Sequence, residues 1–116
     1  MAFDLSEDIR LFVDEVVDSF AMWDLVICFA KKPDEAGSLE DIAQMTGRPI
    51  KELTAHLQKL VTLELVEAVK DETGGIRFTF SRKSPKAQSF QAFLEYNQFQ
   101  ENRLRILSHL LQRGIR

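Results

Sequence analysis

The segment from Arg48 to Thr62 contains polar side chains that would share one side of a helix and could contact a ligand together. At about 100° per residue, a helix here would gather Leu53, Leu57 and Leu60 on one side. The opposite side would carry polar and small residues, namely Arg48, Lys51, Ala55, Gln58, Lys59 and Thr62. Lysine and arginine neutralise phosphates, glutamine can bond the edge of adenine, and alanine leaves room for a thymine methyl group. This side therefore has the chemistry of a surface that enters the major groove of DNA, although lysine and glutamine are also common on an ordinary solvated face.

Some residues near this surface could add DNA contacts, whereas others argue against DNA binding. Thr54 lies on one flank, facing either a phosphate or the preceding helix, and His56 lies on the other flank, where capping or packing is the more common role. Farther along the chain, Lys70 and Arg77 are placed to reach a DNA backbone or minor groove. The intervening Asp71 and Glu72 would repel phosphates. The predicted DNA-contact set is Arg48, Lys51, Thr54, Ala55, Gln58, Lys59, Thr62, Lys70 and Arg77.

Local signals around this segment predict a helix, a tight turn, a second helix and a hairpin. Ser38, with Asp41 three residues later, has capping-box spacing, and Gly47 suits the left-handed end of a short helix. Pro49 fits the first position of the next helix. After it, Leu65–Val69 is rich in β-branched residues, and paired glycines precede a second run of alternating apolar residues. We expect a helix-turn-helix over residues 38–63 and a two-stranded wing over residues 65–81.

The stretch "ELTAHLQKLVTLELVEAV" resembles the recognition helix and first wing strand of bacterial winged-helix transcription factors of the ArsR and MarR types. The preceding "SLEDIAQMTG" is similar to the family's helix before the turn. The resemblance implies a winged helix-turn-helix with terminal helices that build a dimer. The family usually has glycine where this chain has Glu64, so we expect either backbone strain of about 1 kcal/mol or a shifted helix end. The paired cysteines that bind metal in many ArsR-type proteins are missing, and no metal site is expected.

Long helices are predicted on both sides of this unit. Apolar residues at alternating steps of four and three indicate one helix over residues 4–32, and the absence of glycine and proline favours another over residues 87–113. A helix as long as the second, approaching 40 Å at about 1.5 Å per residue, exceeds what a small domain can cover. We therefore predict a dimer interface made by Ile9, Val13, Val16, Phe20, Phe93, Leu104, Leu107 and Leu111.

Composition limits the classes of protein that remain. Hydrophobic residues at 45% and charged residues at 28% of the 116 residues are typical of one globular domain. No apolar run approaches the length of about 20 residues that spans a bilayer, and the acidic N-terminus lacks the basic start of a signal peptide, so a cytoplasmic location is expected. The single Cys28 indicates a buried small hydrophobe rather than a reactive thiol. No set of residues spaced for catalysis appears, so an enzyme is not expected.

The net charge of −3 is unevenly distributed, since residues 1–37 contain nine acidic and three basic residues whereas residues 38–86 contain seven and eight. This pattern permits DNA binding without requiring it. The sequence thus predicts a single domain over residues 1–116, mainly α with a small β-hairpin: a winged helix-turn-helix flanked by long terminal helices. Its predicted function is transcriptional regulation as a homodimer on double-stranded DNA, without a cofactor. The alternative is a winged-helix module that binds a protein partner and no DNA.

Overall fold

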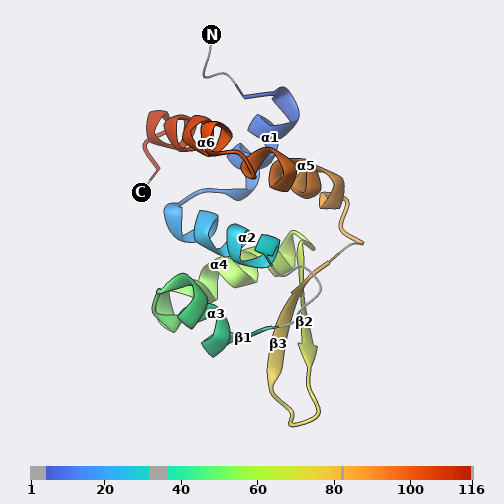
Figure 1. The fold of residues 1–116 in the computed structure, drawn as a ribbon. Coiled ribbons are helices and arrows are strands. Elements are labelled where there is room, and N and C mark those ends of the chain that lie inside the picture. The colour runs from blue at the N-terminus through green and yellow to red at the C-terminus, as the bar shows by residue number, and fades with distance from the viewer. Residues whose placement is uncertain (1–4, 32–36, 82, 116) are drawn as a thin grey trace.

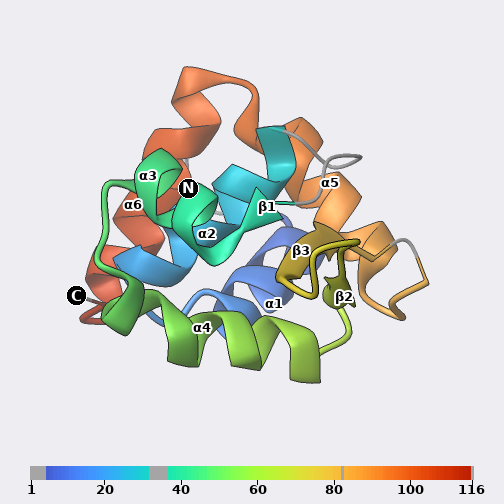
Figure 2. The same cartoon turned by 90° about the horizontal axis from the view of Figure 1, so that it is seen from below.

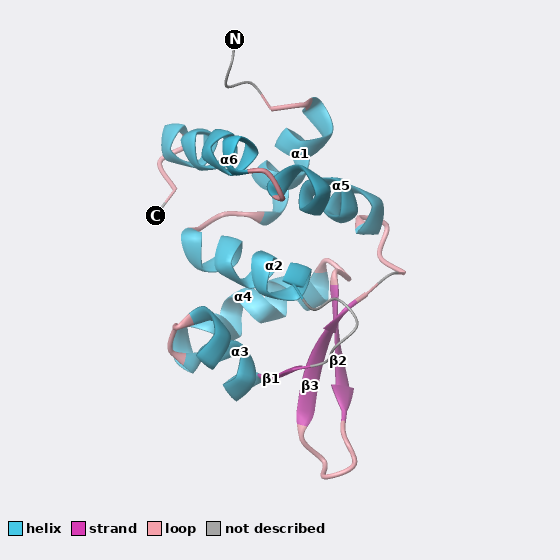
Figure 3. Cartoon of the chain, in the orientation of Figure 1, coloured by secondary structure: helices cyan, strands magenta, loops and turns pink. Residues whose placement is uncertain are grey.

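The computed structural model describes residues 5–31, 37–81 and 83–115, and this part of the chain is mainly helical with a small antiparallel sheet (Figures 1 and 3). One continuous apolar core joins the helices at both ends of the molecule. In chain order the elements are α1 (Glu7–Val16), α2 (Phe20–Lys31), β1 (Gly37–Ser38), α3 (Leu39–Thr46), α4 (Ile50–Thr62), β2 (Val66–Lys70), β3 (Ile76–Phe80), α5 (Ala87–Asn97) and α6 (Gln100–Gln112).

The single N-terminal helix predicted over residues 4–32 is wrong, because the described part consists of two helices. Val17 leaves the helical region with φ −94° and ψ 91°, and α2 starts only at Phe20. The side-chain oxygen of Ser19 accepts a hydrogen bond from the Met22 amide at 3.1 Å. Serine in this capping role satisfies an amide that has no partner within its own helix, and so favours a new helix start. Residues 4 and 32, the predicted ends, lie outside the described residues.

The single C-terminal helix predicted over residues 87–113 is also divided. Phe99 is extended, with φ −97° and ψ 134°, and separates α5 from α6. The break leaves the last carbonyls of α5 without partners inside that helix. Arg103 satisfies two of them, since its Nη1 donates to the Asn97 carbonyl at 3.1 Å and to the Gln98 carbonyl at 3.2 Å. The resulting corner folds α6 back over α1, so the chain covers its own helices (Figure 1).

Half of the predicted dimer interface belongs instead to the core of the chain. Val13, Val16 and Phe93 are fully buried and Ile9 is 4% exposed, which excludes these four from contact with a second copy of the folded chain. They are buried because the two helix breaks let α5 pack across α1, where Phe12 meets Phe93 with ring centroids 5.2 Å apart. The remaining members of the predicted interface divide into half-buried Phe20 and Leu107 and exposed Leu104 and Leu111.

Local capping signals place α3 and α4. The Ser38 hydroxyl accepts from the Asp41 amide and the Asp41 carboxylate accepts from the Ser38 amide, both at 3.1 Å, so the predicted capping box is confirmed. Gly47 ends α3 in the left-handed region at φ 70°. Pro49 immediately precedes α4 rather than opening it. A short connection joins the two helices, which run in different directions (Figure 2).

A hairpin follows α4 and projects away from the helices. Strands β2 and β3 pair antiparallel from Val66 opposite Phe80 to Lys70 opposite Ile76. A third short strand, which the sequence did not predict, pairs Gly37 with Phe78 on the other side of β3. This pairing ties the middle of β3 to the start of α3.

Candidate nucleic-acid interface

Helix α4 lies along one side of the molecule, with its outer face uncovered by the other described elements (Figure 2). The predicted inner side is confirmed, because Leu53, Leu57 and Leu60 are all buried. The predicted outer side is mostly exposed: Lys51, Thr54, Ala55, Gln58 and Thr62 are accessible to solvent. Figure 1 shows α5 and α6 above α2, and α4 below it, so the C-terminal helices do not cover the outer face of α4. The polar outer face of α4 is therefore accessible to a large ligand.

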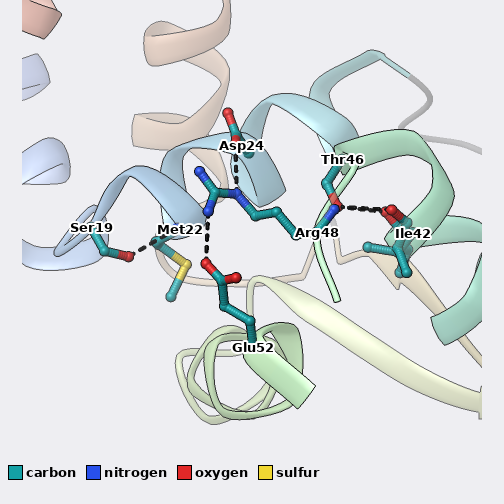
Figure 4. A network of polar contacts seen from close by, with 8 residues as sticks. Ser19, Met22, Asp24, Ile42, Thr46, Arg48 and Glu52 are labelled. Atoms are coloured by element: carbon teal, nitrogen blue, oxygen red, sulfur yellow. Dashed lines mark hydrogen bonds and ion pairs between the residues drawn. The ribbon is translucent and has the colours of Figure 1, made fainter. Parts of the chain in front are cut away.

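Arg48 is held by two carboxylates of the same molecule (Figure 4). Its Nε lies 2.8 Å from Asp24 on α2, and its Nη1 lies 2.7 Å from Glu52 on α4. The hydrogen bond to Asp24 is the main cause that raises the pKa of Arg48, partial burial acts in the opposite direction, and Glu52 adds to the increase. Arg48 therefore fastens the start of α4 to α2 and is not turned outward as the sequence predicted.

Lys59 is engaged in a similar way in the last turn of α4. Its Nζ lies 2.9 Å from the Asp18 carboxylate and 3.5 Å from the Val16 carbonyl, in the connection between α1 and α2. Burial of Asp18 acts to raise its pKa, but the hydrogen bond and charge of Lys59 outweigh it, with help from the charge of His56, and the pKa is lowered. His56 is itself half-buried. Lys59 thus serves as an anchor between helices.

The hairpin presents one of its two predicted cations more openly than the other. Lys70 is exposed at the end of β2, whereas Arg77 lies 3.6 Å from Asp41 at the start of α3. Asp71 shapes the turn between the strands, because its Oδ1 accepts from the amides of Thr73 and Gly75, each at 2.9 Å. The Thr73 hydroxyl is the first cause of the lowered pKa of Asp71, and these amides contribute as well. The tip therefore keeps its negative charge at neutral pH.

Two threonines on the exposed face of α4 use their hydroxyl groups within the helix. Thr54 Oγ1 donates to the Ile50 carbonyl and Thr62 Oγ1 donates to the Gln58 carbonyl, each at 2.9 Å. Back-bonding of this kind occupies the hydroxyl proton and turns the oxygen toward the preceding turn. Each threonine can then accept a hydrogen bond but not donate one, and its γ-methyl group adds an apolar contact.

An apolar groove of about 240 Å³ runs between α4 and the hairpin. The hairpin side is formed by Ala68, Ile76 and Phe78, which share one face of the two strands because side chains alternate. Near the tip this face has left the core, and Ile76 is 53% exposed. The groove is lined by Leu39, Thr54, Leu57, Gln58, Val61, Ala68, Ile76 and Phe78.

Sequence reasoning missed both this groove and the carboxylates that hold the cations. The pair between Arg48 and Glu52 was visible in the sequence, since residues four apart on a helix are neighbours. The partners Asp18 and Asp24 are 41 and 24 residues from their cations, so only the folded chain brings them together. No helix in the described residues combines the length and apolar character needed to cross a membrane.

No protein-family model matches the chain, and no curated protein sequence is significantly similar to it.

Proposed function

We propose that this chain is a winged helix-turn-helix protein that binds double-stranded DNA as a homodimeric transcriptional regulator. In this proposal α3 and α4 are the helix-turn-helix, and β2 and β3 are the wing. The observation that carries it is the uncovered outer face of α4, which presents polar and small side chains along a helix of suitable size for the major groove. The order of helix, short turn, helix and hairpin supports the same proposal.

The DNA-contact set we propose is smaller than the one expected from the sequence. Arg48, Lys59 and Arg77 contact carboxylates of the same chain, and binding through them would require those contacts to break. The contacts that remain are Lys51, Thr54, Ala55, Gln58, Thr62 and Lys70. With few phosphate-binding cations, affinity would depend on base contacts more than in a strongly basic DNA-binding protein.

The proposed dimer forms through the outer face of α6. Leu104 and Leu111 are seven residues apart, about two helical turns, so they share one face, and they are 55% and 58% exposed. Their side of α6 is opposite the buried Ile106 and Leu110. A two-fold contact here would leave both copies of α4 uncovered, as binding of two DNA half-sites requires.

Salt titration of binding to a random-sequence duplex tests the proposal. We expect the intact chain to bind at low salt, with an affinity that falls as salt rises, because released counterions drive phosphate contacts. The Lys51→Ala variant should weaken binding and reduce the slope of log affinity against log salt by about 1. Arg105→Ala on α6 removes the same charge far from α4 and should leave the slope unchanged. Equal slopes for the two variants would remove α4 from the DNA interface.

A second candidate function is a winged-helix module that binds a protein partner. The apolar groove between α4 and the hairpin favours it, as does the neutralisation of three predicted DNA-contact cations within the chain. Duplex DNA and heparin columns at low salt discriminate between the two functions. Retention that fades with salt supports the regulator, and passage without retention supports the protein-binding module.

A further inference from the structure

Two of the three cations in and just before α4, the residue types that commonly read guanine, are held by carboxylates of the same chain. Arginine or lysine, bonded to both O6 and N7, is the usual reader of guanine in the major groove. Arg48 instead contacts Asp24 and Glu52, and Lys59 contacts Asp18. Lys51, in the first turn, is the exposed cation of α4. The middle of the helix therefore has few means of selecting a G·C pair.

What the exposed side of α4 does offer is a row of methyl groups that extends to the last residue of the helix. Thr54 and Thr62 are exposed and have their hydroxyl protons bonded inside the helix, so these hydroxyl groups do not donate to a base, and the γ-methyl groups are available for apolar contacts. Ala55 adds a third methyl group on the exposed face. The C5-methyl group of thymine is the one apolar group that a base pair displays in the major groove, and small methyl-bearing side chains are its usual contacts.

Gln58 supplies the polar half of the same surface. It is exposed one helical turn after Thr54, so the two side chains are neighbours about 5–6 Å apart. A glutamine amide both donates and accepts, which matches the N6 and N7 groups of adenine. From Ala55 to Thr62 the helix rises about 10 Å, comparable to about three base pairs at 3.4 Å each.

We propose that α4 recognises A·T-rich DNA, with the methyl groups of Thr54 and Ala55 against thymine methyl groups and the Gln58 amide against adenine. This inference rests on the proposed DNA-binding function and names the class of base pair that the site selects. It assigns Lys51 to phosphate neutralisation rather than to base selection.

Three duplexes of 24 base pairs test the inference with the intact chain: alternating dA and dT, the same duplex with deoxyuridine in place of thymidine, and alternating dG and dC. Deoxyuridine lacks only the C5-methyl group, so it probes the methyl contact without changing the hydrogen-bonding pattern. We expect the Gln58 contact alone to make binding to the dA·dT duplex about tenfold tighter than to the dG·dC duplex, as one good base contact would, and each methyl contact to increase this ratio further. Replacement by deoxyuridine should weaken binding by about fourfold for each thymine methyl group that packs against a side-chain methyl group.

Matched variants assign the effect to named atoms. Thr54→Val keeps a γ-methyl group and should keep the preference for thymidine over deoxyuridine, whereas Thr54→Ser keeps only the hydroxyl and should reduce this preference by about fourfold, the part contributed by one methyl contact. Gln58→Ala should reduce the preference for the dA·dT duplex over the dG·dC duplex by about tenfold. Salt-dependent binding of equal strength to all three duplexes would overturn the base preference while leaving DNA binding intact. Identical behaviour of Thr54→Val and Thr54→Ser would overturn the methyl contact, and no binding to any duplex would overturn both proposals.

Discussion

Glu64 occupies a backbone conformation that suits glycine, at the point where α4 gives way to the hairpin. It has φ 63° and is the one non-glycine residue with a positive φ in the described part of the chain. The Leu65 amide donates to the Leu60 carbonyl at 3.0 Å and the Glu64 amide donates to the Val61 carbonyl at 2.9 Å. These two bonds are the Schellman pattern, in which the left-handed residue is usually glycine. The sequence left two outcomes open at this position, and the structure has the strained one.

We predict that Glu64→Gly stabilises the protein by about 1 kcal/mol, because glycine adopts the left-handed region without the steric cost of a side chain. Urea denaturation measures the change in the free energy of unfolding. Gly47→Ala is the matched control, since Gly47 has φ 70° and no atom lies near an added β-carbon. It should destabilise by about 1 kcal/mol through backbone strain alone. A lower midpoint for Glu64→Gly would show that the Glu64 side chain contributes more than its backbone costs.

Because Lys59 contacts Asp18, we predict that the free energy of unfolding decreases at low pH. Because the folded chain lowers the pKa of Asp18, the pair stabilises the fold fully above the ordinary carboxyl value of 3.8, and this contribution disappears as pH falls through the lower folded value. Asp18 is 46% exposed, so solvent screening limits the contribution to about 0.5 kcal/mol.

Lys59→Met tests this dependence. The variant should lack this stabilisation at pH 7 and differ less from the parent chain near pH 2. The carbon chemical shift of the Asp18 carboxyl group, followed by NMR titration, should report a higher pKa in the variant. If the midpoint of the NMR titration of Asp18 is the same in the variant and the parent chain, Lys59 does not interact with Asp18 in solution.

At the scale of elements, the two helix breaks decide the arrangement of the whole chain. The first break depends on Ser19, whose hydroxyl caps α2. We predict that Ser19→Ala destabilises the fold by about 1 kcal/mol, whereas Ser19→Asp retains most of the stability because aspartate is an equally good cap. Thermal unfolding followed by circular dichroism measures both variants. Equal melting temperatures for Ser19→Ala and the parent chain would show that the break has another cause.

The elements that the sequence predicts well are those with local signals. The capping box at Ser38, the left-handed Gly47 and the alternation in β3 all act within a few residues, so their types and spacing are visible in the chain. The breaks near Ser19 and Phe99 are not visible in this way, because apolar periodicity continues across the first and no glycine or proline marks the second. The corner at Phe99 is stabilised by Arg103, which any solvated helix could carry. For the candidate site, the inner and outer sides of α4 follow from periodicity, whereas the engagement of Arg48 and Lys59 depends on distant carboxylates.

At the scale of the whole molecule, charges that are separated along the sequence are brought together in space. The acidic N-terminal third supplies Asp24 to Arg48 just before the start of α4 and Asp18 to Lys59 in its last turn. These pairs fasten α4 to the helices behind it while removing positive charge from its surroundings. Non-specific DNA binding depends mainly on phosphate contacts. A regulator built this way would therefore bind random DNA weakly and rely on base contacts for affinity.

The assembly of two chains is the remaining condition for this function. We predict that Leu104→Glu combined with Leu111→Glu converts a dimer to a monomer, because four glutamates would face one another across a two-fold interface that now holds four exposed leucines. Both positions are exposed in the single chain, so its stability should change by less than about 0.5 kcal/mol. Light scattering after size-exclusion chromatography gives the mass, and thermal unfolding checks the fold. Ile76→Glu, at an equally exposed apolar position on the hairpin, is the control and should remain dimeric.

The monomeric variant should also lose most of its affinity for a duplex with two half-sites, since the two α4 helices would no longer bind together. If the parent chain already runs as a monomer at high concentration, the outer face of α6 is not a self-association surface and the homodimer is excluded.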